Sequence, residues 1–534
     1  MNLLSIPRHA LRAGLAIALI ALAGACRMAP QSIQIPMRDG KSLAADIYLP
    51  SNVGTYPTIL IQTPYDRAVY QAQLPFQADD YAFVIVDMRG YFGSVGAINP
   101  SAKPGQDGYD CVEWIAQQSW SDGHVGTWGP SALGVIQFQT AREKPPHLKA
   151  AVPQVAGFVT TYGNYFPNGT ERKEYLDAVG SGGANIGSGT ILQHPMKDSW
   201  WNSVESTSDY GASIDIPMLV VGGWYDHRTD DLITSFQSLT SKGGVSSRPS
   251  HRLLMGPWQH EHVDEATAGA VTYAGAEGVA ATETVAFFDR YLRGVGDGPS
   301  GERVKWYDMG TQTWRESAEW PPAGTSNRVF YLGAGGTLDA VAPTVGSAST
   351  PVSYDPQNPS PTIGGSNFQD TAMPSGPQSQ GTVEARGDAI TFTSAALTED
   401  VTLAGKASVM LYASSDRTDT DFAVRLTDVA PDGTSMLVVD GVRKARFRNG
   451  VTSQALLTPG AVYSFQVDLP ATAISFQAGH KIRVVVTGSN YPRYYANRND
   501  GGTLYDSNAP YLVAQNTIFH DATHPSQLVL PTLN

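Results

Sequence analysis

The feature of this sequence that most constrains its fold is the alternation of short apolar runs with helix-like runs in two separate stretches, residues 32–153 and 216–293. In the first stretch, residues 58–62 are a predicted buried strand and residues 110–118 a predicted helix. In the second stretch, a closing helix is expected at 282–293. Strands that alternate with helices form a mostly parallel sheet with both faces covered. The sequence therefore predicts an α/β domain in two halves.

Residues 155–213 separate the two halves and carry no strand signal. They contain a glycine-rich patch at 180–189 and several aromatic residues. A segment inserted here lies over the carboxyl ends of the strands, where open α/β sheets bind ligands. We therefore expect a cap, and we expect five of its aromatic side chains to bind substrate: Tyr162, Tyr165, Phe166, Trp200 and Trp201.

Beyond residue 303 the helix signals end and β-patterned runs replace them. An antiparallel sandwich or jelly roll is the simplest fold for such a segment. The β-patterned runs are 407–415, 421–430, 436–447, 462–469 and 481–487, after a Pro- and Ser-rich loop region at 344–381. The expected domains are the two halves of the α/β domain at 26–154 and 214–302, the cap at 155–213 and the β domain at 303–534.

The amino terminus has the pattern of an export signal. Arg8 and Arg12 precede an apolar run at 13–25, which is shorter than the roughly 20 residues of a membrane helix. This predicts a signal peptide over residues 1–25. Cys26 follows Ala-Gly-Ala, where a bacterial lipoprotein carries its lipidated cysteine; ordinary cleavage of a soluble exported protein is the alternative. We expect the mature protein in the periplasm, anchored to the membrane through Cys26, or secreted.

Charge and cysteine content exclude several classes of protein. Lys and Arg number 36 against 49 Asp and Glu, a net charge of −13, and no basic run occurs, which argues against a nucleic-acid partner. Two cysteines cannot build a disulfide scaffold or a four-cysteine zinc site. If Cys26 is lipidated or removed, Cys111 has no partner and is expected to be a buried free thiol.

A nucleophile motif lies in the first half, at Gly129-Pro-Ser131-Ala-Leu-Gly134. A serine on a tight turn from strand to helix exposes its Oγ beside a backbone N–H that can face an oxyanion. The spacing is Gly-x-Ser-x-x-Gly rather than the usual Gly-x-Ser-x-Gly. A helix N-cap is the alternative interpretation of Ser131.

The acid and base candidates follow the serine in the chain order of the α/β-hydrolases, which is serine, acid and then histidine. Asp226 comes directly after the predicted strand 218–221, and His260 after the predicted strand 252–255. Serine requires an adjacent base, and the resulting imidazolium requires a carboxylate. The rival candidates, which lie further past their strands, are Asp230 and Asp231 for the acid and His262 for the base.

Two metal sites can be considered from residue spacing. His260 and His262 with Asp264 could ligate zinc, but this needs a further ligand from elsewhere. The acidic residues Asp416, Asp419 and Asp421 indicate calcium only weakly, because no calcium-loop motif is present. We expect neither a metal nor another cofactor.

The motifs taken together resemble the CocE/NonD-type serine hydrolases, the group that contains cocaine esterase, α-amino acid ester hydrolase and the X-Pro dipeptidyl-peptidases of peptidase family S15. The resemblance covers nearly all of the mature chain. It is carried by the serine motif and by Thr63-Pro-Tyr-Asp-Arg67, Asp87-Met-Arg-Gly-Tyr91, His194-Pro-Met-Lys-Asp198, Gly222-Gly-Trp-Tyr-Asp226 and Gly256-Pro-Trp-Gln-His260.

The resemblance implies an α/β-hydrolase fold with a mostly helical cap and a C-terminal jelly roll of the galactose-binding type. It implies that Ser131 is the nucleophile, His260 the base and Asp226 the acid. It also implies that the Tyr65 hydroxyl and the Ala132 N–H donate to the oxyanion. The family usually has tyrosine directly after the serine, so Ala132 indicates a wider pocket.

The expected function is that of an exported serine hydrolase that cleaves a small ester, amide or peptide through an acyl-enzyme on Ser131. An X-Pro dipeptidyl-peptidase and an α-amino acid ester hydrolase or β-lactam acylase are the alternatives within this class. Such enzymes need carboxylates for the substrate ammonium group, and the cap offers Glu171, Glu174, Asp177 and Asp198. The alternative from another class is a non-catalytic carbohydrate-binding surface protein. The sequence leaves the substrate and the oligomeric state open.

Overall fold

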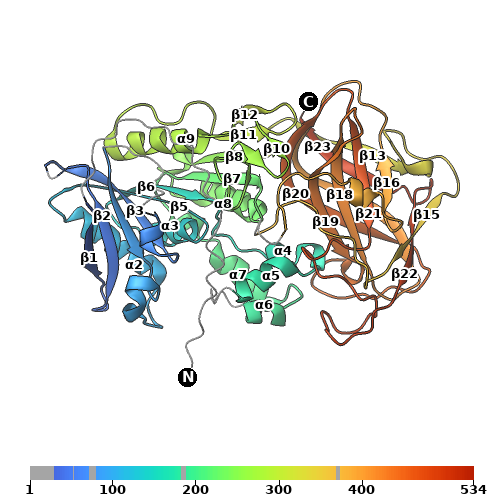
Figure 1. Cartoon of the computed structure of the whole chain (residues 1–534), viewed down its shortest axis with the longest axis horizontal. Coiled ribbons are helices and arrows are strands. Elements are labelled where there is room, and N and C mark those ends of the chain that lie inside the picture. Colours follow the sequence, from blue (N-terminus) through green and yellow to red (C-terminus); the bar gives the residue numbers. More distant parts are fainter. Residues whose placement is uncertain (1–28, 52, 71–79, 182–187, 369–372, 534) are drawn as a thin grey trace.

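The computed structural model describes residues 29–51, 53–70, 80–181, 188–368 and 373–533. Two large sheets, of ten and eleven strands, lie at opposite ends of the molecule, and a group of helices lies between and below them (Figure 1). The predicted signal peptide, Cys26 and most of the glycine-rich patch at 180–189 lie outside the described residues. Within the described part of the chain, every helix is too short or too polar to cross a membrane.

The ten-stranded sheet has the order β1-β2-β4-β3-β5-β6-β7-β8-β11-β12. The strands from β4 to β11 pair in parallel, while β1, β2 and β12 pair antiparallel at the two edges. Its strands are β1 (Gln31–Pro36), β2 (Ser42–Tyr48), β3 (Tyr56–Thr63), β4 (Ala82–Asp87), β5 (Ser121–Pro130), β6 (Leu148–Gln154), β7 (Leu219–Tyr225), β8 (Arg252–Gln259), β11 (Val304–Asp308) and β12 (Thr313–Ser317). The central strands are apolar on both faces because helices cover both faces.

Four helices cover the sheet, and they divide between its two faces. The helices α2 (Pro104–Ala116), α3 (Ala132–Arg142) and α8 (Thr229–Lys242) place buried side chains in one cluster with the sheet. Helix α9 (Val279–Phe288) packs Phe287 and Phe288 into a second cluster on the opposite face. It continues into a π-helical turn, Asp289–Arg293, and stops at Gly294 (φ 66°). A short helix, α1 (Arg67–Tyr70), follows β3.

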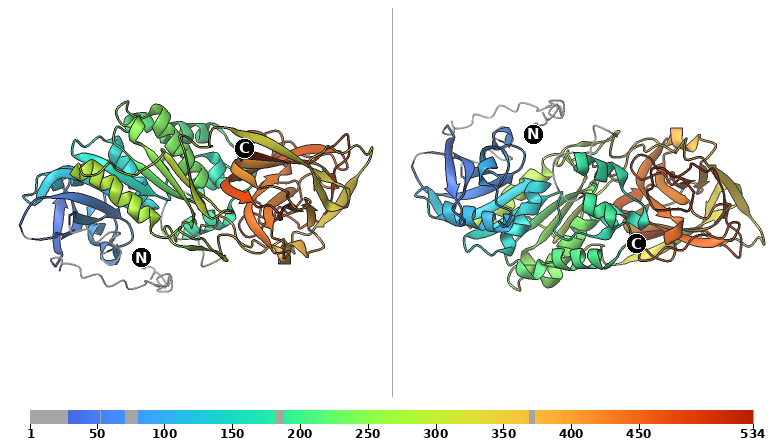
Figure 2. Two further views of the ribbon diagram at one scale, coloured as in Figure 1. Left: turned by 90° about the horizontal axis from the view of Figure 1, so that it is seen from above. Right: turned by 90° about the horizontal axis from the view of Figure 1, so that it is seen from below.

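The chain between β6 and β7 forms the helical cap, as predicted for an insertion at this point. It lies below the ten-stranded sheet and against the eleven-stranded one in Figure 1, and Figure 2 shows the same position from above and below. Its helices are α4 (Tyr162–Tyr165), α5 (Lys173–Ser181), α6 (Ser188–Gln193) and α7 (Ser199–Ser208).

The C-terminal part is all β, apart from one short helix and two 3-10 turns among its described residues, so the predicted fold class is confirmed. Each of the five predicted β runs coincides with one strand from β17 to β21. The region 344–381, expected to be loops, also contains strand β15. The elements are β13 (Thr325–Gly333), β14 (Thr337–Asp339), β15 (Ser349–Tyr354), α10 (Gly381–Glu384), β16 (Ile390–Thr393), β17 (Val401–Ser415), β18 (Asp421–Val429), β19 (Ser435–Lys444), β20 (Tyr463–Phe476), β21 (Lys481–Thr487), β22 (Ala514–Phe519) and β23 (Gln527–Leu533).

The expected boundary at 302/303 does not separate the two sheets. Strand β11 pairs with β8, and β12 pairs with β11, so the first sheet continues through Ser317. The buried carboxylate of Asp308, at the end of β11, accepts hydrogen bonds from the N–H (2.8 Å) and Oγ (2.5 Å) of Ser475 in β20. Arg315 lies 2.8 Å from the same carboxylate. The end of the first sheet therefore connects directly to the β domain.

Candidate active site

Ser131 occupies the one-residue turn between β5 and α3. Its φ of 55° and ψ of −120° are rarely adopted by residues other than glycine. Gly129 and Gly134 make this turn possible, because a Cβ on either would lie 2.6 Å from a side-chain carbon, of Leu133 and Ala156 respectively. The Ser131 side chain makes no capping hydrogen bond to α3, which excludes the N-cap interpretation.

The structure brings Ser131, His260 and Asp226 together. Nε2 of His260 lies 3.0 Å from the Oγ of Ser131, and Nδ1 of His260 lies 3.2 Å from Oδ2 of Asp226. Asp226 follows β7 and His260 follows β8, so both stand at the carboxyl edge of the sheet. Asp226 is 2% exposed and His260 is 8% exposed. This arrangement suits proton transfer from a hydroxyl to an imidazole that a buried carboxylate orients.

Asp226 is held as a carboxylate. Burial alone would raise the pKa of its carboxyl group, but the adjacent His260 and His227 imidazoles outweigh burial and hold this pKa well below its usual range. Its Oδ1 also accepts the backbone N–H of Arg228 at 2.7 Å. Asp226 is therefore charged at neutral pH and able to stabilise an imidazolium.

The rival residues face other partners. Asp230 lies 2.9 Å from Nζ of Lys406 in the β domain and accepts the N–H of Ala471. Asp231 accepts a hydrogen bond from Oγ1 of Thr161, at 2.7 Å. His262 lies 3.1 Å from Oε1 of Glu265. The geometry thus favours Asp226 and His260 over these three candidates.

Tyr65 lies two residues past the end of β3. Its side chain is 48% exposed. Burial raises the pKa of its phenol, and the nearby Ser131 side chain opposes that effect. Ala132 is the first residue of α3, and N–H groups in the first turn of a helix have no acceptor within that helix. Both donors predicted for an oxyanion thus lie beside Ser131.

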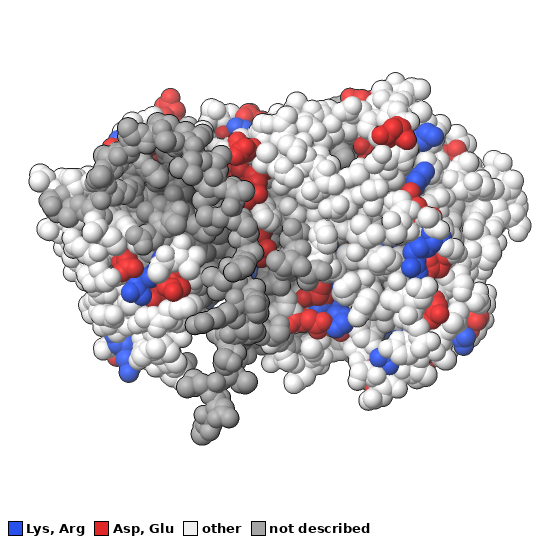
Figure 3. Space-filling model, in the orientation of Figure 1, with Lys and Arg blue, Asp and Glu red and all other residues white. Residues whose placement is uncertain are grey.

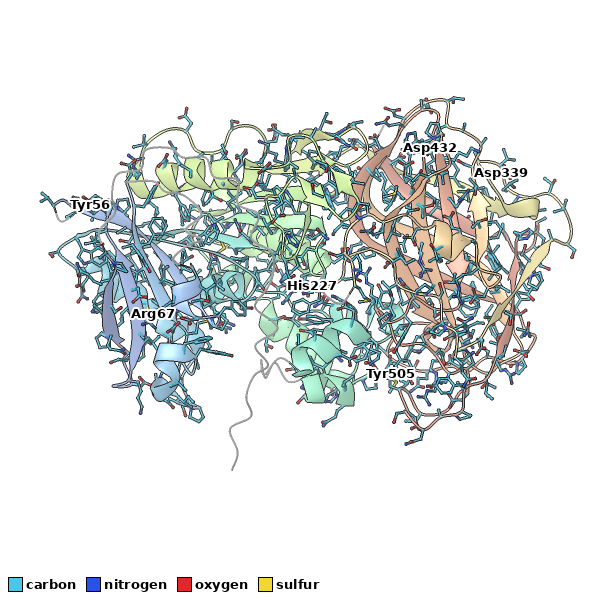
Figure 4. The ribbon with its side chains drawn as sticks, viewed as in Figure 1. Tyr56, Arg67, His227, Asp339, Asp432 and Tyr505 are labelled. Carbon is cyan, nitrogen blue, oxygen red and sulfur yellow. The ribbon has the colours of Figure 1, made fainter. Side chains whose placement is uncertain are left out.

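An ion pair between two neighbouring strand ends fixes the loop that carries Tyr65. Arg67 pairs with the buried carboxylate of Asp87 at the end of β4, and its Nε lies 3.0 Å from Asp46. Asp87 also accepts the backbone N–H of Arg67 at 2.8 Å and that of Gly93 at 2.9 Å. The arginine stands at this junction in the left part of Figure 4. Arg67 and Asp87 belong to two of the motifs noted in the sequence, but no supporting role could be derived for them there.

Two rings pack against His260, and a third ring packs against both of them. His227 packs against it with ring centroids 4.3 Å apart, and Phe368 of the C-terminal part lies 5.6 Å away. Tyr175 of α5 contacts both His227 (5.0 Å) and Phe368 (5.2 Å). Burial, with the neighbouring His260, lowers the pKa of His227 well below its usual value, so His227 is neutral at pH 7. Sequence reasoning missed all three rings, and only His227, directly after Asp226, carried any signal.

The five cap aromatics predicted to bind substrate lie elsewhere, and this prediction is corrected. Four of them are buried and pack on one another as the interior of the helical cap, because a small group of short helices needs a core of its own. Trp200 is partly exposed and stacks on His194 at 4.6 Å. The four buried residues are Tyr162, Tyr165, Phe166 and Trp201.

The cap carboxylates are also largely engaged. Glu174 lies 3.3 Å from Arg172, Asp177 lies 2.6 Å from Lys173, and Asp198 caps α7 and contacts His194. Glu171 is buried, and burial raises the pKa of its carboxyl group to about 7. A substrate ammonium group would have to compete with these partners.

The residues considered for metals in the sequence have protein partners. Asp264 accepts the backbone N–H groups of Ala280 and Ala281 at the start of α9. In the β domain, Asp419 pairs with Arg446 (2.8 Å) and Asp421 with Lys444 (3.1 Å). These contacts give Asp264, Asp419 and Asp421 partners within the protein. Cys111 is buried as a free thiol, as predicted.

Comparisons with known proteins identify the family of this chain. The family model described as X-Pro dipeptidyl-peptidase (S15 family) matches residues 39–185 and 185–262, and the model of the X-Pro dipeptidyl-peptidase C-terminal non-catalytic domain matches 300–529. The chain is 32% identical over 573 residues to cocaine esterase from Rhodococcus sp. (strain MB1 Bresler), covering 94% of this chain and 98% of the relative. The chain belongs to the CocE/NonD-type S15 family of serine hydrolases.

Solved structures share the whole architecture of this S15-family hydrolase. An aminopeptidase from the marine sediment archaeon Thaumarchaeota archaeon has a TM-score of 0.82 at 24% identity and covers 95% of this chain and 96% of its own. An α-amino acid ester hydrolase has a TM-score of 0.81 at 24% identity and covers 99% and 100%. These likenesses establish the fold. The family membership makes this chain an enzyme and removes the non-catalytic alternative.

Proposed function

We propose that this hydrolase cleaves a carboxylic ester through an acyl-enzyme on Ser131. His260 takes the proton of the Ser131 hydroxyl as the oxygen attacks the ester carbonyl, and Asp226 stabilises the resulting imidazolium. The imidazolium then returns the proton to the leaving alcohol. Water, deprotonated by His260, releases the acid and restores Ser131. The observation that carries this proposal is the chain of contacts at 3.0 Å and 3.2 Å from Ser131 through His260 to Asp226.

The hydroxyl of Tyr65 and the N–H of Ala132 donate to the oxyanion that forms during both steps. Each donor of this kind contributes about 3–4 kcal/mol to the stabilisation of the transition state. Tyr65 keeps its proton at neutral pH because the pKa of a phenol is about 10, and burial raises the pKa of Tyr65 further. It therefore acts as a donor rather than as a base.

The rings beside the base support an uncharged, aromatic or bulky acyl group. Phe368 is partly exposed and lies next to His260, and Tyr175 supports it from behind. Aromatic pairs prefer offset or edge contacts of about 4.5–7 Å between centroids, which a ring in the acyl group can make with Phe368. By contrast, two of the four cap carboxylates are held in ion pairs and a third, Asp198, contacts His194, which disfavours a free α-ammonium group. An ester of an aromatic acid is thus preferred to an X-Pro peptide or an amino-acid ester.

A substrate comparison tests this choice. We expect kcat/KM for p-nitrophenyl benzoate to exceed that for an alanyl ester and for an X-Pro p-nitroanilide at least tenfold. Ser131→Ala should lower the rate by a factor of order 10⁴ or more, and it should remove labelling by a fluorophosphonate. Faster cleavage of the X-Pro substrate would reject the ester proposal while leaving the serine mechanism intact.

We also propose that the protein is exported and that Cys26 is lipidated. The proposal rests on the apolar run at 13–25 and on Ala-Gly-Ala directly before Cys26. Expression of the full chain in a bacterium and fractionation of the cells test it. Wild type should enter the membrane fraction and incorporate labelled palmitate, whereas Cys26→Ala should do neither. Retention of both forms in the cytoplasm would contradict export.

A further inference from the structure

His227 has an unusual position for a buried histidine. Its side chain is 1% exposed, and its Nδ1 lies 3.2 Å from Oδ1 of Asp226. This contact is poorly aligned for a hydrogen bond, and the nitrogen has no better-aligned partner among the described residues. A buried polar atom that is weakly hydrogen-bonded costs free energy, and its retention calls for an explanation. Figure 4 shows His227 where the ten-stranded sheet, the helical cap and the β domain meet.

The three side chains at this point have the composition of a metal-ligand set. Asp226, His227 and His260 each offer one ligand atom, and these atoms lie within 4.8 Å of one another. Two imidazoles and one carboxylate are ligands that Zn²⁺ accepts, at about 2.0–2.2 Å. In a tetrahedral site, ligand atoms at such distances are about 3.3 Å apart. Nδ1 of His260 lies 3.2 Å from Oδ2 of Asp226, and Nδ1 of His227 lies 3.2 Å from the other oxygen, Oδ1, so each nitrogen already has the spacing to the carboxylate that a shared ion needs.

We propose that Asp226, His227 and His260 bind Zn²⁺ and that the bound ion switches the enzyme off; the inhibitory effect rests on the proposed roles of Ser131 and His260. Zn²⁺ takes the lone pair of Nδ1 of His260. A neutral imidazole carries one N–H, which then has to be on Nε2. Nε2, 3.0 Å from Ser131 Oγ, becomes a donor and cannot accept the serine proton. The ion also takes up the charge of Asp226, which no longer orients the base.

A cavity supplies the path by which the ion reaches the site. It has a volume of about 250 Å³, lies between the sheet domain, the cap and the β domain, and is lined by both Asp226 and His227. Its lining has four carboxylates and three cationic side chains, so its charge does not repel a cation. These charged residues are Asp226, Asp230, Asp231, Asp468, Arg172, Lys406 and Arg493.

A titration of the chelator-treated full chain with Zn²⁺ tests the inhibition, with an aryl ester as substrate. Wild type should lose at least tenfold of its rate at saturating Zn²⁺ and recover with EDTA, while Mg²⁺ at the same concentration has no effect because it prefers oxygen ligands. His227→Phe should raise the half-inhibitory Zn²⁺ concentration at least tenfold. Even the loss of a residue that only hydrogen-bonds to a metal ligand lowers metal affinity about 10–100-fold, and His227 is itself a ligand in this proposal. Unchanged sensitivity of His227→Phe would overturn the proposal.

His262→Phe is the matched control. This histidine lies two residues after His260 and contacts Glu265 at the surface. Its replacement should leave the half-inhibitory concentration as in wild type. If instead His262→Phe abolishes the inhibition, the ion binds the His260 and His262 pair and the proposed ligand set is wrong.

A binding measurement separates this proposal from the catalytic one and from loss of folding. Ser131→Ala keeps all three ligands, and Co²⁺ bound tetrahedrally to it should give intense visible absorption that Zn²⁺ abolishes. The double variants Ser131→Ala/His227→Phe and Ser131→Ala/His227→Gln should lack this absorption, with circular dichroism to confirm that each is folded. Equal absorption in a folded double variant would overturn the metal site, whatever the esterase assays show.

Discussion

Asp87 accepts the backbone N–H of Arg67 at 2.8 Å and pairs with its side chain, which fixes the chain two residues beyond Tyr65. The carboxylate is fully buried at the end of β4, whereas Tyr65 is half exposed. The buried contact between Arg67 and Asp87 thus restrains the loop that carries the half-exposed Tyr65 hydroxyl. Supporting contacts of this kind keep catalytic groups within a fraction of an ångström of their working position.

Arg67→Lys should therefore lower kcat about tenfold with a smaller change in KM. Lysine keeps the charge that Asp87 needs, but it cannot bridge Asp46 and Asp87 as the arginine does. In a Tyr65→Phe background the same change should have little further effect, because the hydroxyl that it positions is gone. Arg38→Lys, which alters the exposed pair with Asp110, is the control and should leave kcat unchanged. Additive losses in the double variant would reject the positioning role.

Tyr65→Phe should lower kcat roughly 10²–10³-fold, because one donor to the oxyanion is removed while the ring remains. The rate of acylation by an ester with a good leaving group is the measurement. Tyr56→Phe, at the far left of Figure 4, changes a hydroxyl that binds Ser51 and Val53 and should have no effect. A loss of less than about threefold for Tyr65→Phe would make Tyr65 only a wall of the pocket.

Asp226→Asn should lower kcat by several orders of magnitude, because the amide favours the wrong tautomer of His260. Asp231→Asn is a matched control in the following helix, since Asp231 is equally buried but contacts Thr161 instead of a histidine. It should retain most of the activity. The reverse result would move the role of the acid to α8.

Stability should depend on pH through Glu171. Burial raises the pKa of this carboxyl group from 4.5 to about 7, so the folded chain binds the proton more tightly than the unfolded chain does. The resulting stabilisation is complete below pH 4.5 and is lost as the pH rises through 7, with a magnitude of about 3 kcal/mol. Glu171→Gln should therefore match wild type in melting temperature at pH 4.5 and exceed it by a few degrees at pH 8.

Thermal melts between pH 4.5 and pH 8 check this prediction. The control is Glu277→Gln, which changes an exposed glutamate and should melt in parallel with wild type. Parallel curves for Glu171→Gln and wild type would show that Glu171 ionises without cost in the folded protein.

The sequence predicts the order of strands and helices best where helices cover both faces of a strand. Residues 59–61 are apolar because β3 is buried between two layers, and the sequence therefore indicates a buried strand at this point. The end of the first sheet was misplaced for a related reason. Strand β11 has the pattern of any buried strand, and no local signal tells which of two sheets it joins.

Some residues of the site can likewise be predicted from the sequence, and others cannot. Ser131, Asp226 and His260 each follow a strand of one parallel sheet, so topology alone places them at a common edge. Phe368 reaches His260 from the C-terminal part, and Tyr175 of the cap packs against Phe368, through contacts between segments far apart in the sequence. The cap aromatics were assigned to the substrate because a pattern of aromatic residues does not reveal whether they form a surface or a core.

The position of Phe368 beside His260 has a consequence for the order in which activity arises. Ribosomes complete Ser131, Asp226 and His260 about 100 residues before they reach Phe368. A chain interrupted between these points has every reacting group but lacks one wall around its base. Exchange of the β domains between relatives would accordingly change the wall beside His260 while leaving the reacting groups unaltered. Substrate specificity can therefore change in evolution without any change in Ser131, Asp226 or His260.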